Sequence, residues 1–241
     1  MIKTAMVMAA GHGTRMRHLT EDRSKAMVGV GGKPLIDHTL DRLVAAGVER
    51  AVVNVHAHAD HLESRLAGRR DIEIIISDER ELLLETGGGV VKALPLLGDD
   101  PVFVCNIDAC WVEWEPVLPA LLRAWDAEAM DELFLLAPRE HCLGFNGKGD
   151  FEIEGGKLVR RRGETAPWVY AGVEIFKPRL AKSWAERYVN TELAKRAFSR
   201  NRIWDETLAR GRVAGVPIPG YWMHVGDPDA RRAAEAVLAA T

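Results

Sequence analysis

An apolar run, Ile2–Met8, leads directly into the stretch Ala9-Ala10-Gly11-His12-Gly13-Thr14-Arg15-Met16. The run is short and bounded by turn-forming residues, which predicts a buried strand. The two glycines predict a tight loop, because glycine adopts positive φ and lets another group approach the backbone. Successive N–H groups in such a loop can converge on an anion, and Arg15 and Lys25 add cations suited to phosphate. This arrangement favours a polyphosphate site, although Gly-X-Gly after a strand is often only a turn.

The loop differs from two common phosphate signatures. No Gly-Lys-Ser/Thr follows it, as a Walker A loop requires, and Met16 stands where the dinucleotide fingerprint has its third glycine. The longer pattern, which continues through Leu19-Thr20 to Lys25, instead resembles the signature of sugar-1-phosphate nucleotidylyltransferases. The resemblance extends, with gaps, to about Asp227. Within the family it is strongest to the short bacterial enzymes that act on N-acetylmuramate 1-phosphate or mannose 1-phosphate.

The composition indicates a globular protein with no general attraction for polyanions. The 241 residues are 47% hydrophobic and carry a formal net charge of −3, so we expect a sizeable core and no binding to nucleic acid or to a membrane. We recognise no signal peptide and no apolar span of ~20 residues. The cysteines Cys105, Cys110 and Cys142 lack zinc-type spacing, which favours a reduced, cytoplasmic setting. A monomer and a homodimer are both compatible with the sequence.

Strand and helix patterns alternate through the first 138 residues. Strands are expected at 2–8, 51–55, 72–76, 101–106 and 133–137, with helices at 34–46, 61–66, 90–94 and 116–125. Such alternation predicts an α/β fold with a Rossmann-like, mostly parallel central sheet and helices on both faces. The resemblance implies the same architecture, the nucleotide-diphospho-sugar transferase fold.

The pattern changes after Pro138. Gly155-Gly156 between two short apolar runs predicts a β-hairpin. Further strands are expected at 168–176, 213–217 and 221–225, with two helices between 178 and 210 and an Ala-rich helix from 228 onward. Because no long linker or repeat interrupts the chain, we expect one nucleotidyltransferase domain over residues 1–241. Its nucleotide-binding part is 1–138, and a small β-rich, sugar-phosphate-binding part with the C-terminal helix, 139–241, extends the same sheet.

The tripeptide Asn106-Ile107-Asp108 follows the fourth predicted strand. Ligands of open parallel sheets collect beyond the carboxyl ends of the strands, so Asp108 is expected on the same side as the glycine loop. A carboxylate beside phosphates requires a cation between them, and Mg²⁺ commonly takes one or two carboxylates plus phosphate oxygens. A helix-capping or turn aspartate is the plainer alternative. The resemblance implies a metal ligand at Asp108, although Ile107 replaces the family's usual glycine.

A second glycine-rich stretch, Glu85-Thr86-Gly87-Gly88-Gly89, precedes a predicted helix. Glycines there would let a flat base lie against the backbone, and a flexible loop is the alternative. The resemblance favours base binding and implies that Arg15, Lys25 and Asp108 are catalytic, although Ser24 and His18 replace two usual prolines. The expected nucleotide-binding residues are Ala9, Ala10, Gly11, Gly13, Thr14, Arg15, Lys25, Glu85, Thr86, Gly87, Gly88 and Asn106.

The segment Tyr221-Trp222-Met223-His224-Val225-Gly226-Asp227 matches a family segment in which an aspartate is the second Mg²⁺ ligand. Here His224 occupies that position. Imidazole is a poor ligand for Mg²⁺, which prefers oxygen donors. Four interpretations stay open: His224 binds a softer ion such as Mn²⁺ or Co²⁺, it holds a metal-bound water or a phosphate, Asp227 supplies the missing carboxylate, or His224 only fills a strand end.

The resemblance also implies residues for the sugar. They are Asn146, Gly149, Asp150, Gly172 and Glu174. Four tryptophans, Trp111, Trp114, Trp168 and Trp222, offer apolar faces for a sugar ring, but core packing is the commoner role for each. The histidines His56, His58 and His61 cross a strand–loop–helix junction, so their spacing does not predict a zinc site.

Together these features favour transfer of a nucleotidyl group from an NTP to a sugar 1-phosphate, with release of pyrophosphate. The resemblance implies UTP with N-acetylmuramate 1-phosphate, or GTP with mannose 1-phosphate, as the substrates. Transfer to a phosphorylated alcohol such as choline phosphate is a second hypothesis. A catalytically silent nucleotide-binding regulatory protein is a third, because His224 stands in place of the metal-binding aspartate.

Overall fold

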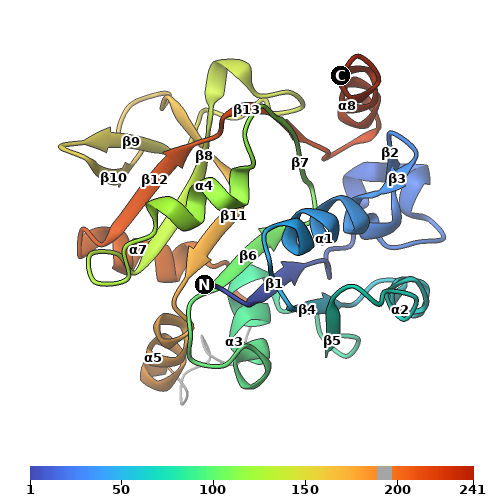
Figure 1. Ribbon diagram of the computed structural model, residues 1–241, viewed down its shortest axis with the longest axis horizontal. Coiled ribbons are helices and arrows are strands. Elements are labelled where there is room, and N and C mark those ends of the chain that lie inside the picture. Colours follow the sequence, from blue (N-terminus) through green and yellow to red (C-terminus); the bar gives the residue numbers. More distant parts are fainter. Residues whose placement is uncertain (189–196) are drawn as a thin grey trace.

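The centre of the fold is a short parallel strand, β1 (Thr4–Met8). In this computed structural model, which describes residues 1–188 and 197–241, β1 pairs with β4 (Arg50–Val55) on one side and with β6 (Val102–Asn106) on the other. Beyond β4, the parallel strand β5 (Glu73–Asp78) forms one edge of the sheet. All four strands therefore end at the same edge, and the loops that follow them gather there (Figure 1).

The sheet continues into the second half of the chain. Strand β11 (Trp168–Phe176) runs antiparallel to β6 and to β8 (Glu132–Pro138), and β8 pairs in parallel with β12 (Val213–Pro217). Strands β9 (Phe151–Glu154) and β10 (Lys157–Arg160) form the predicted hairpin. The hairpin joins the sheet where β9 pairs with β11. Strands from both parts of the chain thus share one sheet, which supports our proposal of a single domain.

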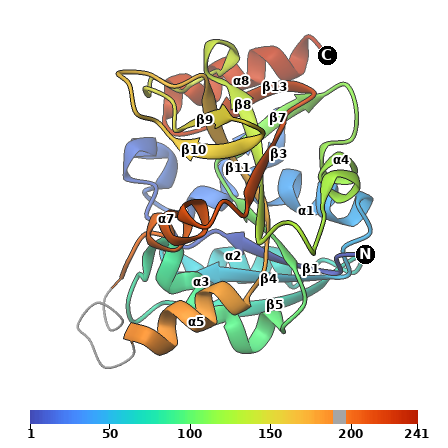
Figure 2. The same ribbon diagram turned by 90° about the vertical axis from the view of Figure 1, so that its left-hand side faces the viewer.

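Helices cover both faces of the sheet, as predicted. Side chains alternate along β1, so Ala5 and Val7 face one hydrophobic cluster while Met6 and Met8 face another. The first cluster includes residues of α1 (Leu35–Ala45), α2 (Ala59–Leu66), α4 (Val117–Ala124) and α8 (Pro228–Ala239). The second includes α3 (Glu85–Leu97) and α5 (Arg179–Tyr188), which lie side by side in Figure 2. The α/β prediction is confirmed.

A small second sheet was not predicted. Strand β7 (Ala109–Glu113) turns away after Asp108 and pairs antiparallel with β13 (Gly220–His224). This pairing places His224 opposite Ala109. The sequence signal is weak because β7 follows β6 after only two residues, Ile107 and Asp108. Its consequence is that residues more than a hundred positions apart meet beside the end of β6.

The helices after β11 agree with the prediction where the structure describes them. Helix α5 and helix α7 (Asn201–Ala209) lie within the expected range, and residues 189–196 between them are outside the described residues. In the described part of the chain, no helix is both long enough and apolar enough to cross a bilayer.

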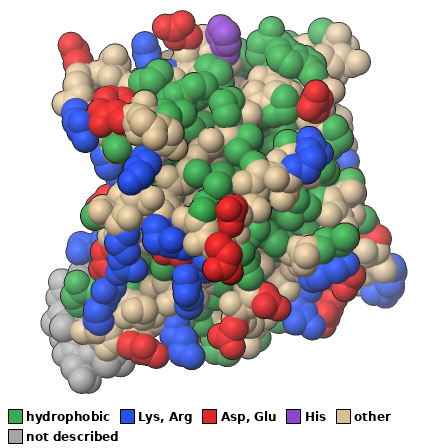
Figure 3. Space-filling view, turned by 60° about the vertical axis from the view of Figure 1, so that its left-hand side comes forward, with side chains coloured by type: hydrophobic (Ala, Val, Ile, Leu, Met, Phe, Trp, Pro, Cys, Tyr) green, Lys and Arg blue, Asp and Glu red, His purple; other side chains and the backbone are tan. Residues whose placement is uncertain are grey.

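On the side of β9, β10 and α7, Lys and Arg side chains gather in the lower part of the surface with Asp and Glu beside them (Figure 3).

Arg200 lies near two buried carboxylates in this half of the sheet and is the cation that attracts both. It forms an ion pair with Glu174 of β11, and its Nη2 lies 3.4 Å from the hydroxyl oxygen of Tyr170. Glu132 of β8 is also fully buried and accepts a hydrogen bond of 3.2 Å from Thr207. Burial and the charge of Glu174 raise the pKa of Glu132 well above its usual range, and burial raises the pKa of Glu174 to about 7 against the attraction of Arg200. One guanidinium does not neutralise two buried carboxylates, so we expect the folded protein to keep a proton on this pair at pH values where a free glutamate is ionised.

This proton makes stability depend on pH. A raised pKa in the folded state stabilises the protein fully below the ordinary glutamate pKa of 4.5, and the benefit is lost as pH rises through the folded value. Glu132→Gln keeps the shape of the side chain without the titration. The urea concentration at the unfolding midpoint is measured at about pH 5 and at about pH 8. Between these two pH values the midpoint should fall less for Glu132→Gln than for the parent. Equal losses in the two proteins would contradict the shared proton.

Candidate active site

The glycine loop after β1 forms one wall of a cavity. Gly13 adopts φ +65°, and the chain then winds into a short 3-10 helix, Thr14–Thr20. The cavity has a volume of about 520 Å³. Its lining includes Ala10, Gly11, His12, Gly13, Thr14, Arg15, Lys25, Glu85, Thr86, Asn106 and Asp108. Most of the predicted nucleotide-binding residues therefore surround one space, at the edge where the parallel strands end.

A buried asparagine in β4 fixes the start of this loop. Asn54 Oδ1 accepts hydrogen bonds from the backbone N–H groups of Ala9 (2.6 Å) and Ala10 (3.2 Å). Its Nδ2 donates to Glu79 Oε1 (2.8 Å), and Glu79 Oε2 accepts from the N–H of Leu84, just before α3. This brace joins the glycine loop to the start of α3. The Ala9 N–H group, a predicted nucleotide contact, is therefore already hydrogen-bonded within the protein.

A charge cluster forms where the cavity meets the end of β6. Lys25 Nζ lies 3.0 Å from Asp108 Oδ2, and His224 Nε2 lies 3.3 Å from the same oxygen. Because an ionised carboxylate only accepts hydrogen bonds, the ring nitrogen donates. Burial alone would raise the pKa of Asp108, but the Lys25 ammonium and the hydrogen bond from His224 hold it well below its usual range. Asp108 is therefore an ionised carboxylate that accepts hydrogen bonds from Lys25 and His224.

Asp227 has a structural task. Its Oδ1 accepts a hydrogen bond of 2.8 Å from the N–H of Ala230, which caps helix α8. This hydrogen bond, helped by the nearby charges of Arg15 and His224, holds the pKa of Asp227 below its usual range against the opposing effect of burial. Its neighbour Gly226 lines the cavity, whereas Asp227 itself does not. The prediction that Asp227 replaces the missing metal ligand thus has a competing explanation in helix capping.

A second cavity, of about 230 Å³, adjoins the first. The two cavities share Asn106 and Asp108. The lining of the second cavity also includes Phe145, Asp150, Arg160, Tyr170, Gly172, Asn201, Trp204, Trp222 and His224. The predicted sugar residues Asp150 and Gly172 therefore lie here. Gly172 adopts φ +78°, and a Cβ at this position would lie 2.8 Å from that of Ala109, so the backbone approach requires glycine.

Three predicted sugar residues do not line this cavity. Glu174 is fully buried in its ion pair with Arg200, because β11 bulges between Tyr170 and Glu174. Gly149 packs so that a Cβ would lie 2.1 Å from the carbonyl oxygen of Ala166, which indicates a role in the turn. Asn146 is exposed beside Phe145. The predicted sugar contact of Glu174 stays a prediction, and the structure shows its carboxylate paired with Arg200.

The second glycine-rich stretch also differs from its prediction. Gly87 and Gly88 lie inside helix α3, not in a loop before it. Both N–H groups donate to the carbonyl oxygen of Phe198, at 2.8 and 3.3 Å, and a Cβ on Gly87 would lie 2.3 Å from the Phe198 ring. Gly87 therefore admits the 198–200 segment, and among the predicted residues Glu85, Thr86, Gly87 and Gly88 the first two line the cavity. Sequence reasoning also missed Asn54, Ser199, Arg160, Asn201 and Trp204.

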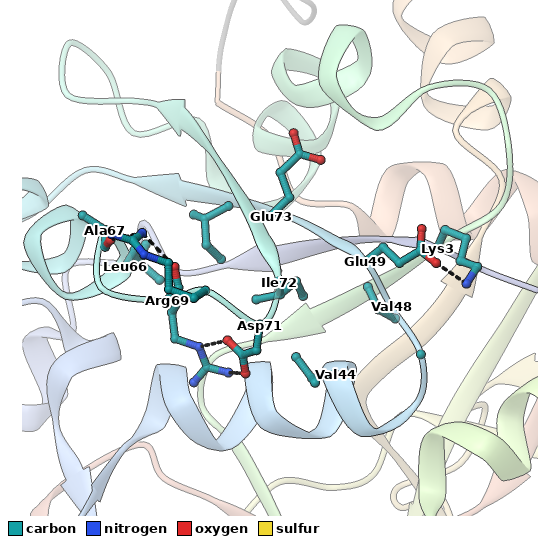
Figure 4. A pocket seen from close by; sticks show the side chains of 13 residues that line it. Lys3, Val44, Val48, Glu49, Leu66, Ala67, Arg69, Asp71, Ile72 and Glu73 are labelled. Carbon is teal, nitrogen blue, oxygen red and sulfur yellow. Dashed lines mark hydrogen bonds and ion pairs between the residues drawn. The ribbon is translucent and has the colours of Figure 1, made fainter.

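A third cavity, of about 710 Å³, lies at the opposite edge of the sheet (Figure 4). It is formed by residues that precede or begin the parallel strands, such as Lys3, Glu49 and Glu73. Figure 4 shows charged side chains engaged with one another: Lys3 with Glu49, and Arg69 with Asp71 at 2.8 Å. The glycine loop and Asp108 are on the other edge, so we assign this cavity no part in the reaction.

The sequence matches the family described as MobA-like NTP transferase domain over residues 5–195. It is 51% identical to an N-acetylmuramate alpha-1-phosphate uridylyltransferase of Caulobacter vibrioides, over 98% of this chain and 97% of the relative. A protein of the same description from Neisseria meningitidis is 30% identical over 98% of each chain. Among solved structures, the inositol-1-phosphate CTP transferase from T. maritima has a TM-score of 0.77 and 17% identity, and covers 95% of this chain and 91% of that one. This last similarity concerns the fold alone.

The Asn54 brace is testable by unfolding. Asn54→Ala leaves two loop N–H groups and Glu79 Oε1 without their hydrogen-bond partner, and a buried unsatisfied group costs about 1–3 kcal/mol. Ser77→Ala is a matched control: Ser77 is buried on β5 opposite Asn54, and its hydroxyl has no hydrogen-bond partner among the described residues. In denaturant unfolding, we expect a large fall in the free energy of unfolding for Asn54→Ala and little change in it for Ser77→Ala. Similar values for both would contradict the brace.

Proposed function

We propose that this nucleotidyltransferase, which belongs to the MobA-like NTP transferase domain family, transfers the uridylyl group of UTP to N-acetylmuramate 1-phosphate. The products would be UDP-N-acetylmuramate and pyrophosphate. The observation that carries the proposal is the pair of cavities, about 520 and 230 Å³, that share Asn106 and Asp108. A transfer between two bound phosphates needs two sites that meet at the reacting phosphorus.

The choice of substrates rests on the relatives. Two uridylyltransferases of N-acetylmuramate 1-phosphate match this chain over nearly its whole length, at 51% and 30% identity. GTP with mannose 1-phosphate is the alternative pair. The free cysteines of the described chain are compatible with a reducing compartment, and we place the reaction in the cytoplasm as part of the proposal.

The larger cavity suits the nucleotide. Arg15 is exposed on its wall and Lys25 is buried at its base. A planar guanidinium and a compact ammonium both bind phosphate oxygens well. In the proposed complex, Arg15 and Lys25 hold the triphosphate, and Lys25 exchanges part of its contact with Asp108 for a phosphate oxygen. Glu85 and Thr86, from the first turn of α3, lie on the wall that would face the base.

The smaller cavity suits the acceptor. An oxygen of its phosphate attacks the α-phosphorus of UTP, and the bond to the leaving pyrophosphate breaks as the new one forms. The attacking oxygen is already anionic, so no side chain has to remove a proton. What the protein must supply is alignment and charge neutralisation. Asn106, on the wall of both cavities, is placed to orient the two phosphates.

Asp108 fits a divalent cation held jointly with substrate. Its Oδ1 has no hydrogen-bond partner among the described residues, while Lys25 and His224 hold Oδ2. No group of three or more His, Cys, Asp and Glu side chains suited to an ion occurs in residues 1–188 and 197–241. This agrees with Mg²⁺, which is commonly bound through one or two carboxylates plus phosphates. When bound, the cation would neutralise charge on the reacting phosphates.

The direct test is a substrate screen. Purified protein is mixed with UTP, GTP or CTP and with N-acetylmuramate 1-phosphate, mannose 1-phosphate or choline phosphate, and pyrophosphate release is measured. We expect the highest kcat/KM for UTP with N-acetylmuramate 1-phosphate. A preference for choline phosphate would favour the alcohol-phosphate hypothesis, and no release with any pair would favour the regulatory one.

Asp108→Asn tests the shared carboxylate. The substitution keeps the shape but removes the charge that would bind the cation, so we expect turnover to fall about 100-fold or more. The circular dichroism spectrum should stay that of the folded parent, while the unfolding midpoint should fall, because the buried Lys25 ammonium loses its ion-pair partner. Near-normal turnover at limiting Mg²⁺ would show that Asp108 does not bind the metal.

His224→Asp tests the third member of the charge cluster. Imidazole suits Mn²⁺ and Co²⁺ better than Mg²⁺, and only the neutral ring coordinates a metal. If His224 contacts the metal, the parent should work at least as well with Mn²⁺ or Co²⁺ as with Mg²⁺. The variant should shift this preference toward Mg²⁺. Identical metal preferences in the two proteins would mean that His224 only orients Asp108.

A further inference from the structure

The acceptor cavity has a second end, away from Asp108. Side-chain contacts trace the path to it. Gly172 lies against Asn106 at the phosphate end, and Tyr170 on the same strand packs against Trp204 with ring centroids 4.7 Å apart. The guanidinium of Arg160 in turn lies 5.7 Å from the centre of the Trp204 ring. Tyr170 and Trp204 thus link Arg160 to the phosphate end of the cavity, and we expect a sugar bound through its 1-phosphate beside Asp108 to extend along this path toward Arg160.

Arg160 is held rigidly at this place. It is the last residue of β10, and its guanidinium stands over the ring of Phe151 at 5.2 Å. Its Nε donates to Asp205 Oδ1 (2.9 Å) and its Nη2 donates to Asn201 Oδ1 (3.0 Å), both on α7. These contacts fix the plane of the fork. They also bring together two elements, the hairpin and α7, that close this side of the cavity.

Part of the fork remains unused. Within residues 1–188 and 197–241, Nη1 of Arg160 has no hydrogen-bond partner. The ion pair with Asp205 is a weak competitor for another anion, because the Asp205 side chain is 63% exposed. Among the described residues that line the smaller cavity, Arg160 is also the only lysine or arginine. The far end of the acceptor cavity thus presents an oriented cation with free donors.

The proposed acceptor carries a group that matches this cation. N-acetylmuramate differs from N-acetylglucosamine by a lactyl ether on O3, two ring carbons from the phosphate-bearing C1, and this ether ends in a carboxylate. A guanidinium binds a carboxylate with directed, charge-assisted hydrogen bonds. We propose that Arg160 recognises the lactyl carboxylate and so selects N-acetylmuramate 1-phosphate over N-acetylglucosamine 1-phosphate. This inference rests on the proposed function.

The experiment pairs a change in the protein with a change in the acceptor. The kcat/KM with UTP is measured for the parent, Arg160→Met and Arg162→Met, each with N-acetylmuramate 1-phosphate, its lactyl methyl ester and N-acetylglucosamine 1-phosphate. Arg162 is the matched control, because it lies on the same hairpin segment, pairs with Glu154 and does not line the cavity. Arg160→Met should lower kcat/KM for the free acid by about 10- to 100-fold, and much less for the two acceptors without the carboxylate. Arg162→Met should keep the parent's preference.

The outcomes separate the two claims. If the parent prefers the free acid and Arg160→Met loses that preference, the carboxylate contact is established. If the variant lowers kcat/KM equally for all three acceptors, Arg160 only supports the hairpin, and the inference is wrong while the proposed function stands. If the parent does not use N-acetylmuramate 1-phosphate, the proposed function fails and this inference fails with it.

Discussion

The parallel pairing of β1 between β4 and β6 is the constraint on which the site depends. Three strands that run side by side in one direction must release their following loops at one edge of the sheet. One of these loops carries the glycines, β4 contributes Asn54 near its end, and β6 leads into Asp108. The ion pair between Lys25 and Asp108, 83 positions apart, is a consequence of this topology. No local motif would bring them together.

A second constraint links the two cavities through the 198–200 segment. Phe198 accepts hydrogen bonds from the first glycines of α3, and the N–H of Arg200 donates to Thr86 on the nucleotide side (3.0 Å). The Arg200 guanidinium reaches to the other side, where it pairs with Glu174 and approaches Tyr170 and Trp204. The wall of the nucleotide cavity and the wall of the acceptor cavity are therefore both anchored by one short stretch of backbone, residues 198–200. The buried carboxylates beside Arg200 keep that stretch anchored.

The sequence predicted what local patterns encode. Strand–helix alternation predicted the α/β sheet, and the glycine loop and Asp108 were correctly expected at one edge. It could not place pairings between distant residues: β7 was missed because its partner β13 lies over a hundred positions away. Glu174 was expected to meet the sugar, but Arg200, 26 positions later in the sequence, takes its carboxylate. Asn54 and Arg160 were missed because an isolated polar residue in a strand carries no motif.

In the proposed complex, the nucleotide and the sugar phosphate meet at Asp108. The most direct measurement is a crystal structure of the protein with UDP-N-acetylmuramate and Mg²⁺. We expect the diphosphate beside Asp108 and Lys25, the uracil against the first turn of α3, and the sugar in the cavity between β11 and α7. A diphosphate bound away from Asp108, or base and sugar in one cavity, would contradict it.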